Sequence, residues 1–310
     1  MTRLRLATRS SDLALAQSRA IAARIESELG LAVELVPLKT SGDRLQDVSL
    51  AKVGGKGLFV KELEEALLEG RADIAVHSAK DLPAETPPGL AFVAFPERAD
   101  PRDALVPREE GATLASLRQG ARVGTGSVRR TALLRAHRPD LEIVPLRGNV
   151  PTRIAKIESE GLDAVLLACA GLDRLGFADR ISERLSPDVL LPAVGQGTLA
   201  IEARDGDPKT RVVAKLACER ATASARAERA FLAGLAGDCS VPLAAFADVG
   251  ADGMLHLRAL LTSLDGRRVL RQEARVPAAE GEAAGAAAAA AILADGGAAL
   301  LAELRAADGR

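Results

Sequence analysis

The chain contains no tryptophan and no tyrosine, and its only aromatic residues are six phenylalanines. Proteins that hold single-stranded nucleic acid usually stack its bases on aromatic side chains, so the sequence offers hardly any material for such a surface. The net charge of −1 also gives no overall basic character that would attract nucleic acid. We therefore expect no nucleic-acid partner, and a hydrophobic core built from Leu, Val, Ile and Ala.

Cysteine and histidine are scarce, with three of each in 310 residues. The cysteines show no spacing typical of a metal site or a redox pair, and their odd number argues against a disulfide framework. No metal site is expected. Cys169 follows an apolar strand and Cys218 lies in a predicted helix, which favours buried, inert thiols. Cys239 lies in a loop of small residues, where a structural and a reactive role are about equally well supported.

Long hydrophobic runs are also missing. The first residues, MTRLRLATRS, lack the apolar core of a signal peptide. The longest run of alanines, over 286–291, is too short to span a membrane. We expect a cytoplasmic protein without a membrane partner, and its length is sufficient for two or three domains.

The stretch 72–83, ADIAVHSAKDLP, combines a buried strand with polar side chains at its end. An apolar run is followed by His77, Ser78, Lys80 and Asp81, and Pro83 is incompatible with continued strand pairing. The carboxyl ends of strands in open α/β sheets face the ligand crevice, so these side chains form a candidate site. A lysine–aspartate pair by itself is more typical of a solvated turn. The arginines at several other strand ends favour a binding site here instead.

The first third of the chain alternates strand and helix patterns. A strand over 4–7, a helix over 12–29 and a strand over 33–38 predict a β-α-β unit and a parallel sheet. Residues 41–57 read as a loop that we expect to be a mobile lid, because the spacing of a phosphate-binding loop is absent. A helix over 59–68 leads into the candidate site, and residues 96–101 are typical of a hinge to a second domain.

Arginines follow several of the predicted strands. Gly124-Thr125-Gly126-Ser127 leads from one strand end into Arg129, Arg130 and a helix, and helix N-termini bind anions. Six arginines lie at or near strand ends: Arg9, Arg129, Arg130, Arg147, Arg153 and Arg174. A position on the solvent-exposed surface explains the other arginines of the chain well. The positions of these six at strand ends favour one shared anion-binding cleft.

The C-terminal part has a different pattern. A linker over 191–197 and a strand over 199–202 precede a long helical region over 212–235. Three strands follow, over 243–249, 255–261 and 269–276, with Asp-Gly hairpin signals between them. An alanine-rich helix from residue 283, broken at 296–297, completes an α+β domain with a small antiparallel sheet.

Together these residues resemble the porphobilinogen deaminase (hydroxymethylbilane synthase) family. The similarity runs from residue 4 to about 249 and continues more weakly to the C-terminus. The matching stretches are ATRSS at 7–11, VGGKGLFVKELE at 53–64, HSAKDLP at 77–83, Gly124-Thr125 with Arg129-Arg130, LRGN at 146–149 with Arg153, and LPAVGQG at 191–197.

The resemblance implies a three-domain α/β fold whose first two domains are similar to type II periplasmic binding proteins. Domain 1 would comprise residues 1–97 and 197–216, and domain 2 residues 98–196. Domain 3, residues 217–310, would be the α+β domain.

The resemblance also implies a transferase of porphyrin and haem biosynthesis that acts as a cytoplasmic monomer. The family joins four porphobilinogen units head to tail into hydroxymethylbilane and releases ammonia. In this family the growing pyrrole chain is built on a dipyrromethane cofactor, which a cysteine holds through a thioether. The resemblance places that cysteine at Cys239. Asp238 stands where many members have glycine, but the following Ser240-Val241-Pro242 is intact.

Site residues carry over onto the matching positions. Asp81 and Lys80 would be catalytic. Cofactor binding would fall to Cys239, Lys80, Asp81, Ser78, Thr125, Ser127, Arg129, Arg130 and Arg147. Substrate binding would fall to Arg9, Ser11, Gln17, Lys52, Lys56, Phe59, Arg147, Arg153 and Arg174.

The chemistry suits these residue types. Each pyrrole carries an acetate and a propionate, which guanidinium groups bind in a fork-like geometry. Loss of ammonia leaves a cationic azafulvene, which the ionised carboxylate of Asp81 would stabilise. We expect Lys80 to lower the pKa of Asp81 and to contact substrate carboxylate.

Two other classes of protein remain open on sequence grounds. A non-catalytic solute-binding protein shares the two-domain fold but has no use for Cys239. An anion-responsive regulator needs a DNA-binding segment, and no helix-turn-helix candidate stands apart. The intact mass of the denatured protein separates these classes, since a dipyrrole adduct excludes both.

Overall fold

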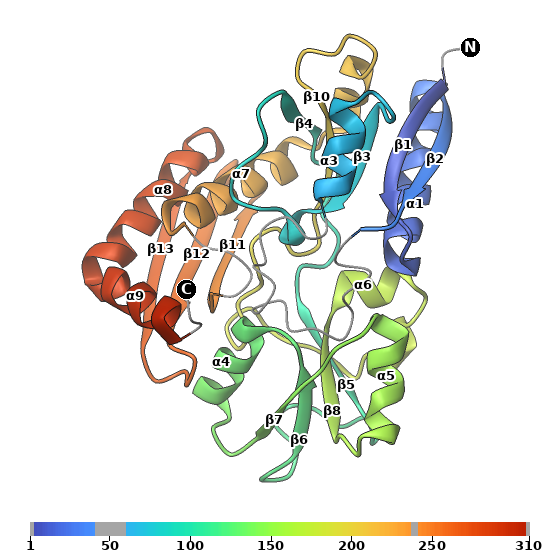
Figure 1. The fold of residues 1–310 in the computed structure, drawn as a ribbon. Helices are drawn as coiled ribbons and strands as arrows, with labels where there is room; N and C mark the ends of the chain where they lie inside the picture. The colour runs from blue at the N-terminus through green and yellow to red at the C-terminus, as the bar shows by residue number, and fades with distance from the viewer. Residues whose placement is uncertain (1–2, 41–59, 237–240, 308–310) are drawn as a thin grey trace.

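The computed structural model describes residues 3–40, 60–236 and 241–307. Over these ranges the chain forms three sheets, each with its own helices (Figure 1). The α/β class with a small antiparallel sheet, expected from the sequence, is confirmed. The expected lid over 41–57, with Lys52 and Lys56, and the residues Phe59 and Cys239 lie outside the described ranges.

The first sheet has the strand order β2-β1-β3-β10-β4. Strand β1 pairs in parallel with both β2 and β3, whereas β10, which comes from much later in the chain, is antiparallel to β3 and β4. Helix α1 ends at Gly30, whose φ of 67° is a left-handed conformation that glycine adopts without strain. The elements are β1 (Arg3–Arg9), α1 (Asp12–Leu29), β2 (Ala32–Leu38), α3 (Lys61–Leu68), β3 (Ile74–Ser78), β4 (Leu90–Ala94) and β10 (Leu199–Arg204).

The second sheet has the order β7-β6-β8-β5-β9. Strand β6 is parallel to β7 and β8, so the three strands end at one edge, and each is followed there by a helix. This edge therefore gathers the N-termini of α4, α5 and α6. The elements are β5 (Asp103–Pro107), β6 (Arg122–Thr125), α4 (Val128–His137), β7 (Glu142–Pro145), α5 (Val150–Ser159), β8 (Ala164–Ala168), α6 (Cys169–Arg174) and β9 (Glu183–Arg184).

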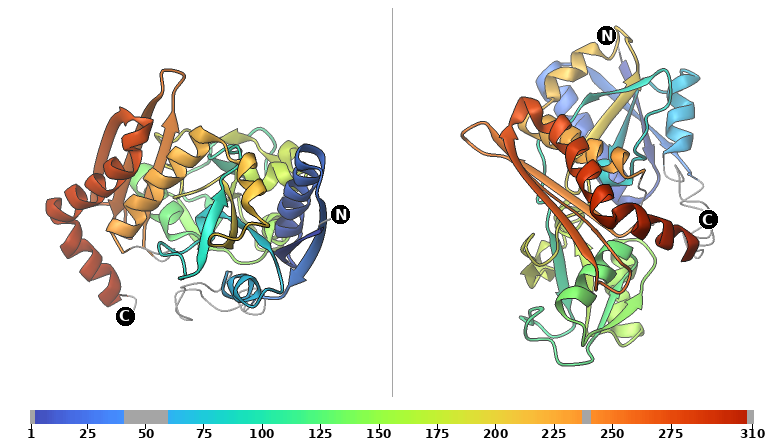
Figure 2. Two further views of the ribbon diagram at one scale, coloured as in Figure 1. Left: turned by 90° about the horizontal axis from the view of Figure 1, so that it is seen from above. Right: turned by 90° about the vertical axis from the view of Figure 1, so that its left-hand side faces the viewer.

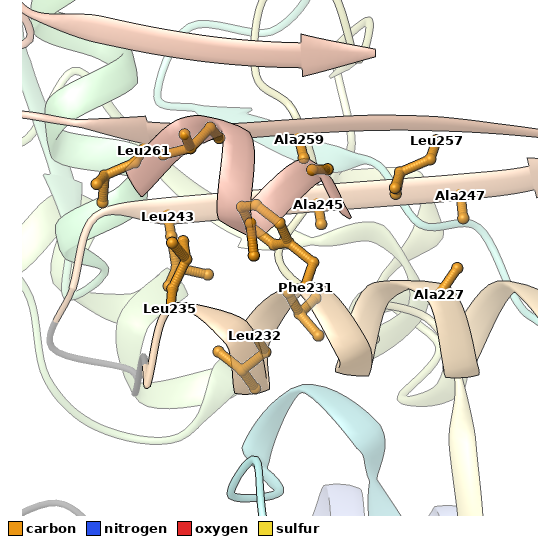
Figure 3. Close-up of a cluster of buried hydrophobic side chains, with 14 of the residues drawn as sticks. Ala227, Phe231, Leu232, Leu235, Leu243, Ala245, Ala247, Leu257, Ala259 and Leu261 are labelled. Atoms are coloured by element: carbon orange, nitrogen blue, oxygen red, sulfur yellow. The ribbon is translucent and has the colours of Figure 1, made fainter. Parts of the chain in front are cut away.

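The third sheet is the antiparallel meander β11 (Leu243–Val249), β12 (Met254–Thr262) and β13 (Val269–Pro277). Helices α7 (Glu219–Gly234), α8 (Gly281–Ile292) and α9 (Ala298–Ala307) accompany it (Figure 2). Phe231 of α7 is fully buried and packs among Leu243, Leu257 and their neighbours between helix and sheet (Figure 3). Burial of this apolar surface attaches α7 firmly to the third sheet.

The helical region expected over 212–235 is present but interrupted, because it consists of two elements. A 3₁₀-helix, η4 (Arg211–Leu216), ends at Ala217, whose backbone is extended, and α7 begins at Glu219. The N–H of Cys218 donates to the carbonyl of Phe95 at 2.9 Å, which ties the break to the end of β4. Cys218 is therefore a partly buried N-cap residue and not a core thiol inside a helix.

The stretch Ala278–Ala307, which contains α8 and α9, is long and apolar enough to cross a membrane by length and composition alone. It contains no long uninterrupted apolar run, and its backbone leaves the helical conformation at Gly296, whose φ is 94°. A core helix of a folded domain meets the same criteria, and here Ala288, Ala289 and Ile292 are buried in the core shared with α7 and β12.

Glu228 of α7 connects the third sheet with the two chain segments that cross between the first and second sheets. Its buried carboxylate accepts hydrogen bonds from Arg98 Nη1 at 2.6 Å, from the N–H of Gly195 at 2.6 Å and from the N–H of Ala247 at 2.8 Å. Arg98 lies in the first crossing segment and Gly195 in the second. One carboxylate thus fixes both crossings against α7 and β11.

Candidate active site

The end of β3 carries a short turn that presents the predicted catalytic pair. The strand stops at Ser78 and not near Pro83, and Ala79–Asp81 form one turn of 3₁₀-helix. The N–H of Ala79 donates to the carbonyl of Thr198 at 3.0 Å, and Leu82 is buried, so both ends of the turn are held. We call Ala79–Asp81 the catalytic turn. The side chain of Asp81 lies at its exposed end.

A cavity of about 20 Å³ opens beside Asp81. Arg9, Gln17, Ser78 and Asp81 line it, together with Ala14, Val60, Val76 and His77. Gln17 and Ser78 hold each other, since Gln17 Nε2 donates to Ser78 Oγ at 2.9 Å. The structure therefore places side chains from β1, α1 and β3 around the catalytic turn. Ser11 is the N-cap residue of α1 and is not among the residues that line this cavity.

Arg129 and Arg130 of α4 are buried and share one counter-ion, Asp103, at the start of β5. Arg129 Nη1 and Nη2 donate to the two oxygens of Asp103 at 2.8 and 3.0 Å, and Arg130 Nε donates at 2.9 Å. Burial alone would raise the pKa of Asp103, but the two guanidinium groups hold it well below its usual range. Gln196 Nε2 completes the set at 3.0 Å.

The six arginines predicted to share a cleft are thus partly neutralised by the protein itself. Asp103 compensates two of them, and neither Asp103 nor Gln196 was recognised in the sequence. An acidic residue at the first position of the otherwise apolar strand over 103–107 was the available signal. Local pattern could not show its partners, which lie 26 and 27 residues further along the chain.

Thr125 and Ser127 shape the loop that leads into α4. Thr125 is buried, and its Oγ1 accepts from the N–H of Ser127 at 3.2 Å. Ser127 is the N-cap residue of α4, and its Oγ accepts from the N–H of Arg130 at 3.4 Å. The helix begins at Val128, so Arg129 and Arg130 lie in its first turn.

Lys80, Arg129, Arg130, Arg147 and Arg153 form what we call the basic cluster. Burial lowers the pKa of Lys80 to about 8; Asp81 opposes this change, and the charges of Arg130 and Arg129 add to it. Burial, together with the charges of Arg130 and Arg147, lowers the pKa of Arg153 to about 10, again opposed by Asp81. The segment with Gly195 and Gln196 lies between the two sheets: a Cβ on Gly195 would lie 3.0 Å from the backbone N of Lys80, and Gln196 Nε2 donates to Asp103 at 3.0 Å. The catalytic turn of the first sheet is therefore close to the edge of the second sheet at which α4 begins.

Arg153 and Arg147 differ in how they are held. Arg153 Nε donates to the carbonyl of Gly148 at 2.6 Å, which fixes its direction. Arg147 is partly buried and forms no ion pair or side-chain hydrogen bond within the part of the chain that the structure describes. Arg174 lies apart from the cluster's couplings; it donates to the carbonyl of Gly197 at 3.0 Å, and burial lowers its pKa.

One further prediction concerns the buried thiol of Cys169. Burial raises the pKa of the Cys169 thiol to about 12, as expected for an inert core cysteine. Within residues 3–40, 60–236 and 241–307, no group of three or more His, Cys, Asp or Glu side chains could hold a metal ion.

The fold and the site define a class: an α/β protein in which two sheets meet around a basic cluster beside one exposed carboxylate, with a third, antiparallel sheet attached to both crossings. Comparison with known families gives the particular member of that class. Residues 4–212 match the family model described as porphobilinogen deaminase, dipyromethane cofactor binding domain, and residues 222–294 match the porphobilinogen deaminase C-terminal domain. The chain belongs to the porphobilinogen deaminase family.

Individual relatives agree along nearly the whole length. The chain is 50% identical over 303 residues to the porphobilinogen deaminase of Syntrophotalea carbinolica, covering 97% of this chain and 96% of the relative. It is 54% identical over 277 residues to that of Sorangium cellulosum, covering 89% and 92%. Among solved structures, the VFT2 domain of BvgS from Bordetella pertussis aligns at 18% identity with a TM-score of 0.41, covering 69% of this chain and 85% of that one.

The donor set fits a dipyrromethane, the cofactor that the family model names. Five cations of the basic cluster face two carboxylates, Asp81 and Asp103. Arg129 Nε is buried without a hydrogen-bond partner among the described residues. Two linked pyrroles with acetate and propionate side chains would supply the missing negative charge.

Proposed function

We propose that the protein is a transferase, hydroxymethylbilane synthase, which condenses four porphobilinogen molecules head to tail and releases ammonia at each step. The observation that carries this proposal is the placement of Asp81 beside the basic cluster at the meeting of two sheets. A polycarboxylate whose reaction passes through a cation needs both features. Cations bind its carboxylates, and an ionised oxygen stabilises the charge that develops.

Substrate carboxylates would be bound by the residues that keep a free or directed donor. Arg147 has no partner among the described residues, and Arg153 is aimed by its bond to the carbonyl of Gly148. Arg9 and Gln17 line the cavity beside Asp81, and on this ground we infer that they bind substrate there. We infer the same substrate role for Ser11, Arg174, Lys52, Lys56 and Phe59 from their matching positions in the family. Thr125 and Ser127 would bind cofactor through the loop that they shape.

Asp81 would act on the reacting pyrrole. Its exposed carboxylate lies at the end of a turn fixed on both sides, so it would be preorganised to accept the pyrrole N–H and to stabilise the positive charge left when ammonia departs. Lys80 would bind a neighbouring carboxylate while it is protonated. Since burial lowers its pKa to about 8, this cationic form prevails near neutral pH.

When bound, the dipyrromethane supplies the free pyrrole end to which porphobilinogen is added. We propose that Lys80, Asp81, Ser78, Arg129, Arg130 and Arg147 hold it and that Cys239 bears it through a thioether. Cys239 is favoured because the other two cysteines are engaged in the fold. Cys169 is buried and its pKa is raised, and Cys218 is the N-cap residue of α7, with its N–H bonded to the carbonyl of Phe95.

We further infer three domains, with the bounds 1–97 together with 197–216, 98–196 and 217–310. We also infer that the protein is a cytoplasmic monomer.

The test is turnover with purified protein and porphobilinogen alone. We expect ammonia release and a linear tetrapyrrole that closes to uroporphyrin after acid oxidation. The Asp81→Asn variant, which keeps the size of the side chain and removes its charge, should form this product at least about a hundredfold more slowly. Binding of porphobilinogen without ammonia release would support a solute-binding protein and contradict the proposal.

A further inference from the structure

A second, larger cavity lies away from the catalytic turn, between β4 and α7. Its volume is about 490 Å³, within the range of small-molecule sites. Neither Asp81 nor any member of the basic cluster lines it. The lining residues are Ala84, Phe92, Val93, Ala94, Phe95, Ala214, Ala217, Thr222, Arg226, Arg229, Ala230, Ala233 and Glu282. Figure 1 shows β4 and α7, the two elements that supply most of these residues.

The body of the cavity is apolar and partly aromatic. Phe92 and Phe95 form a ring pair with centroids 5.6 Å apart, and alanines of η4 and α7 also line the cavity. Such a wall leaves flat, weakly hydrated surface that favours an apolar ring. The occupant should therefore have an aromatic or similarly flat body.

Two polar groups in the cavity lack partners within the described part of the chain. Arg226 is exposed and forms no ion pair or side-chain hydrogen bond there. Thr222 Oγ1 is buried without a hydrogen-bond partner. An unpaired guanidinium favours a carboxylate, and an unpaired buried hydroxyl favours a further hydrogen bond to the same ligand.

The remaining charged groups limit the occupant to one anionic group. Arg229 is already engaged, because it donates to the carbonyls of Pro83 and Ala84 at 3.1 and 3.0 Å and stacks over Phe92 at 4.8 Å. Glu282 is exposed at the rim, where it would repel a second anion. The cavity therefore differs from the active site in the ligand that it favours, since the several cations of the active site suit a polycarboxylate.

We propose that the cavity between β4 and α7 binds a small aromatic monocarboxylate, with its carboxylate on Arg226 and its ring against Phe92 and Phe95. The site is distinct from the one that carries the proposed function. Ala84, which lines it, lies three residues beyond Asp81 and is held by Arg229. A ligand there would contact the segment that leaves the catalytic turn.

The test is calorimetric titration of the full chain with 1-naphthoate, with 1-naphthamide as the uncharged analogue. We expect one naphthoate per chain and at least tenfold weaker binding of naphthamide, a difference of about 1.4 kcal/mol. Arg226→Ala should weaken naphthoate binding at least tenfold. Ala233→Leu, which adds volume at an exposed position lining the cavity, should do the same.

Arg271→Ala is the matched control. Arg271 is exposed on β13, has no side-chain partner in the described ranges and does not line the cavity, so its loss should leave binding unchanged. Naphthoate binding that persists in Arg226→Ala would place the ligand elsewhere, for example on the basic cluster, and would overturn the proposal. Equal binding of naphthamide, or no binding of naphthoate, would overturn it as well. Because no turnover is measured, the result is independent of the proposed function.

Discussion

Asp81 and Asp103 are both coupled to the basic cluster, but their surroundings suit them to different roles. Asp103 is fully buried and accepts hydrogen bonds from Arg129, Arg130 and Gln196. Asp81 is exposed at the end of the catalytic turn and lines the cavity beside it. At the scale of single residues, Asp103 neutralises and orients the arginines, whereas Asp81 remains available to a substrate.

Replacing Asp81 with alanine should lower kcat by at least about a hundredfold, because a preorganised charge at the reacting centre is lost. Asp81→Glu should also be impaired, since one added methylene moves the carboxylate by about an ångström. Steady-state kinetics and thermal unfolding of each variant check this. Glu85→Ala, an exposed acid four residues further on, is the control and should keep wild-type activity. An Asp81→Ala enzyme with a tenth of the wild-type rate would refute the assignment.

Asp73 should make stability depend on pH in the acid range. Burial would raise its pKa, but hydrogen bonds from Arg5 and Lys209 lower it to about 2. A carboxylate whose pKa is depressed by folding contributes stability above its unfolded pKa, near 4, and loses it as pH falls toward 2. The free energy of unfolding of Asp73→Asn should therefore lie below that of wild type at pH 6, and the difference should shrink between pH 4 and pH 2. A difference that stays constant over this range would exclude the ionised group as its source.

At the scale of elements, the strands were largely predictable because short apolar runs stand between glycine and proline signals. Local pattern failed where a distant contact decides the structure. The strand carrying the site ends at Ser78, where Ala79–Asp81 turn into a 3₁₀-helix that is held to the distant Thr198 by the N–H of Ala79. The helical region expected over 212–235 is interrupted at Cys218, whose N–H donates to the carbonyl of Phe95 and not to a helical partner.

The candidate site shows the same division. The turn with Lys80 and Asp81 and the arginines after strand ends could be predicted, since parallel strands of one sheet end at the same edge. Their counter-ion could not, because Asp103 reaches Arg129 only through the folded second sheet. The residues that carry over from the family at Lys52, Lys56, Phe59 and Cys239 stay predictions.

Gly195 should be essential to the catalytic turn. Its φ is +70°, and a Cβ there would lie 2.8 Å from the carbonyl carbon of Ala79 and 3.0 Å from the backbone N of Lys80. Gly195→Ala should therefore displace the turn and lower kcat by about tenfold or more. Gly176→Ala is the matched control, since Gly176 has a φ of +77° with nothing within 4 Å of the added Cβ. Comparable activity losses in both variants would show that backbone strain alone is responsible.

At the scale of the whole molecule, the basic cluster joins two sheets and should make the cofactor part of the folded state. Asp103 compensates Arg129 and Arg130, so the uncompensated charge belongs chiefly to Lys80, Arg147 and Arg153. A bound dipyrromethane would neutralise these cations and, through Cys239, link them to the third sheet. Ligands that bind only the folded state shift unfolding by linkage.

Protein made in cells that cannot supply porphobilinogen should therefore melt several degrees below the cofactor-bearing form. Added salt should narrow the gap, because it screens repulsion among the partly exposed cations. Differential scanning calorimetry at low and high ionic strength measures both effects. Equal midpoints at low salt would show that the cluster does not need the cofactor's negative charge.

The most direct test of the central claim is the intact mass of the denatured protein. We expect the mass of the chain plus two linked pyrrole units, because a thioether survives denaturation whereas bound substrate does not. The adduct should persist in Cys169→Ser and Cys218→Ser and should vanish in Cys239→Ser. An unmodified wild-type mass in protein from porphobilinogen-producing cells, or an adduct that maps to Cys169 or Cys218, would contradict the account.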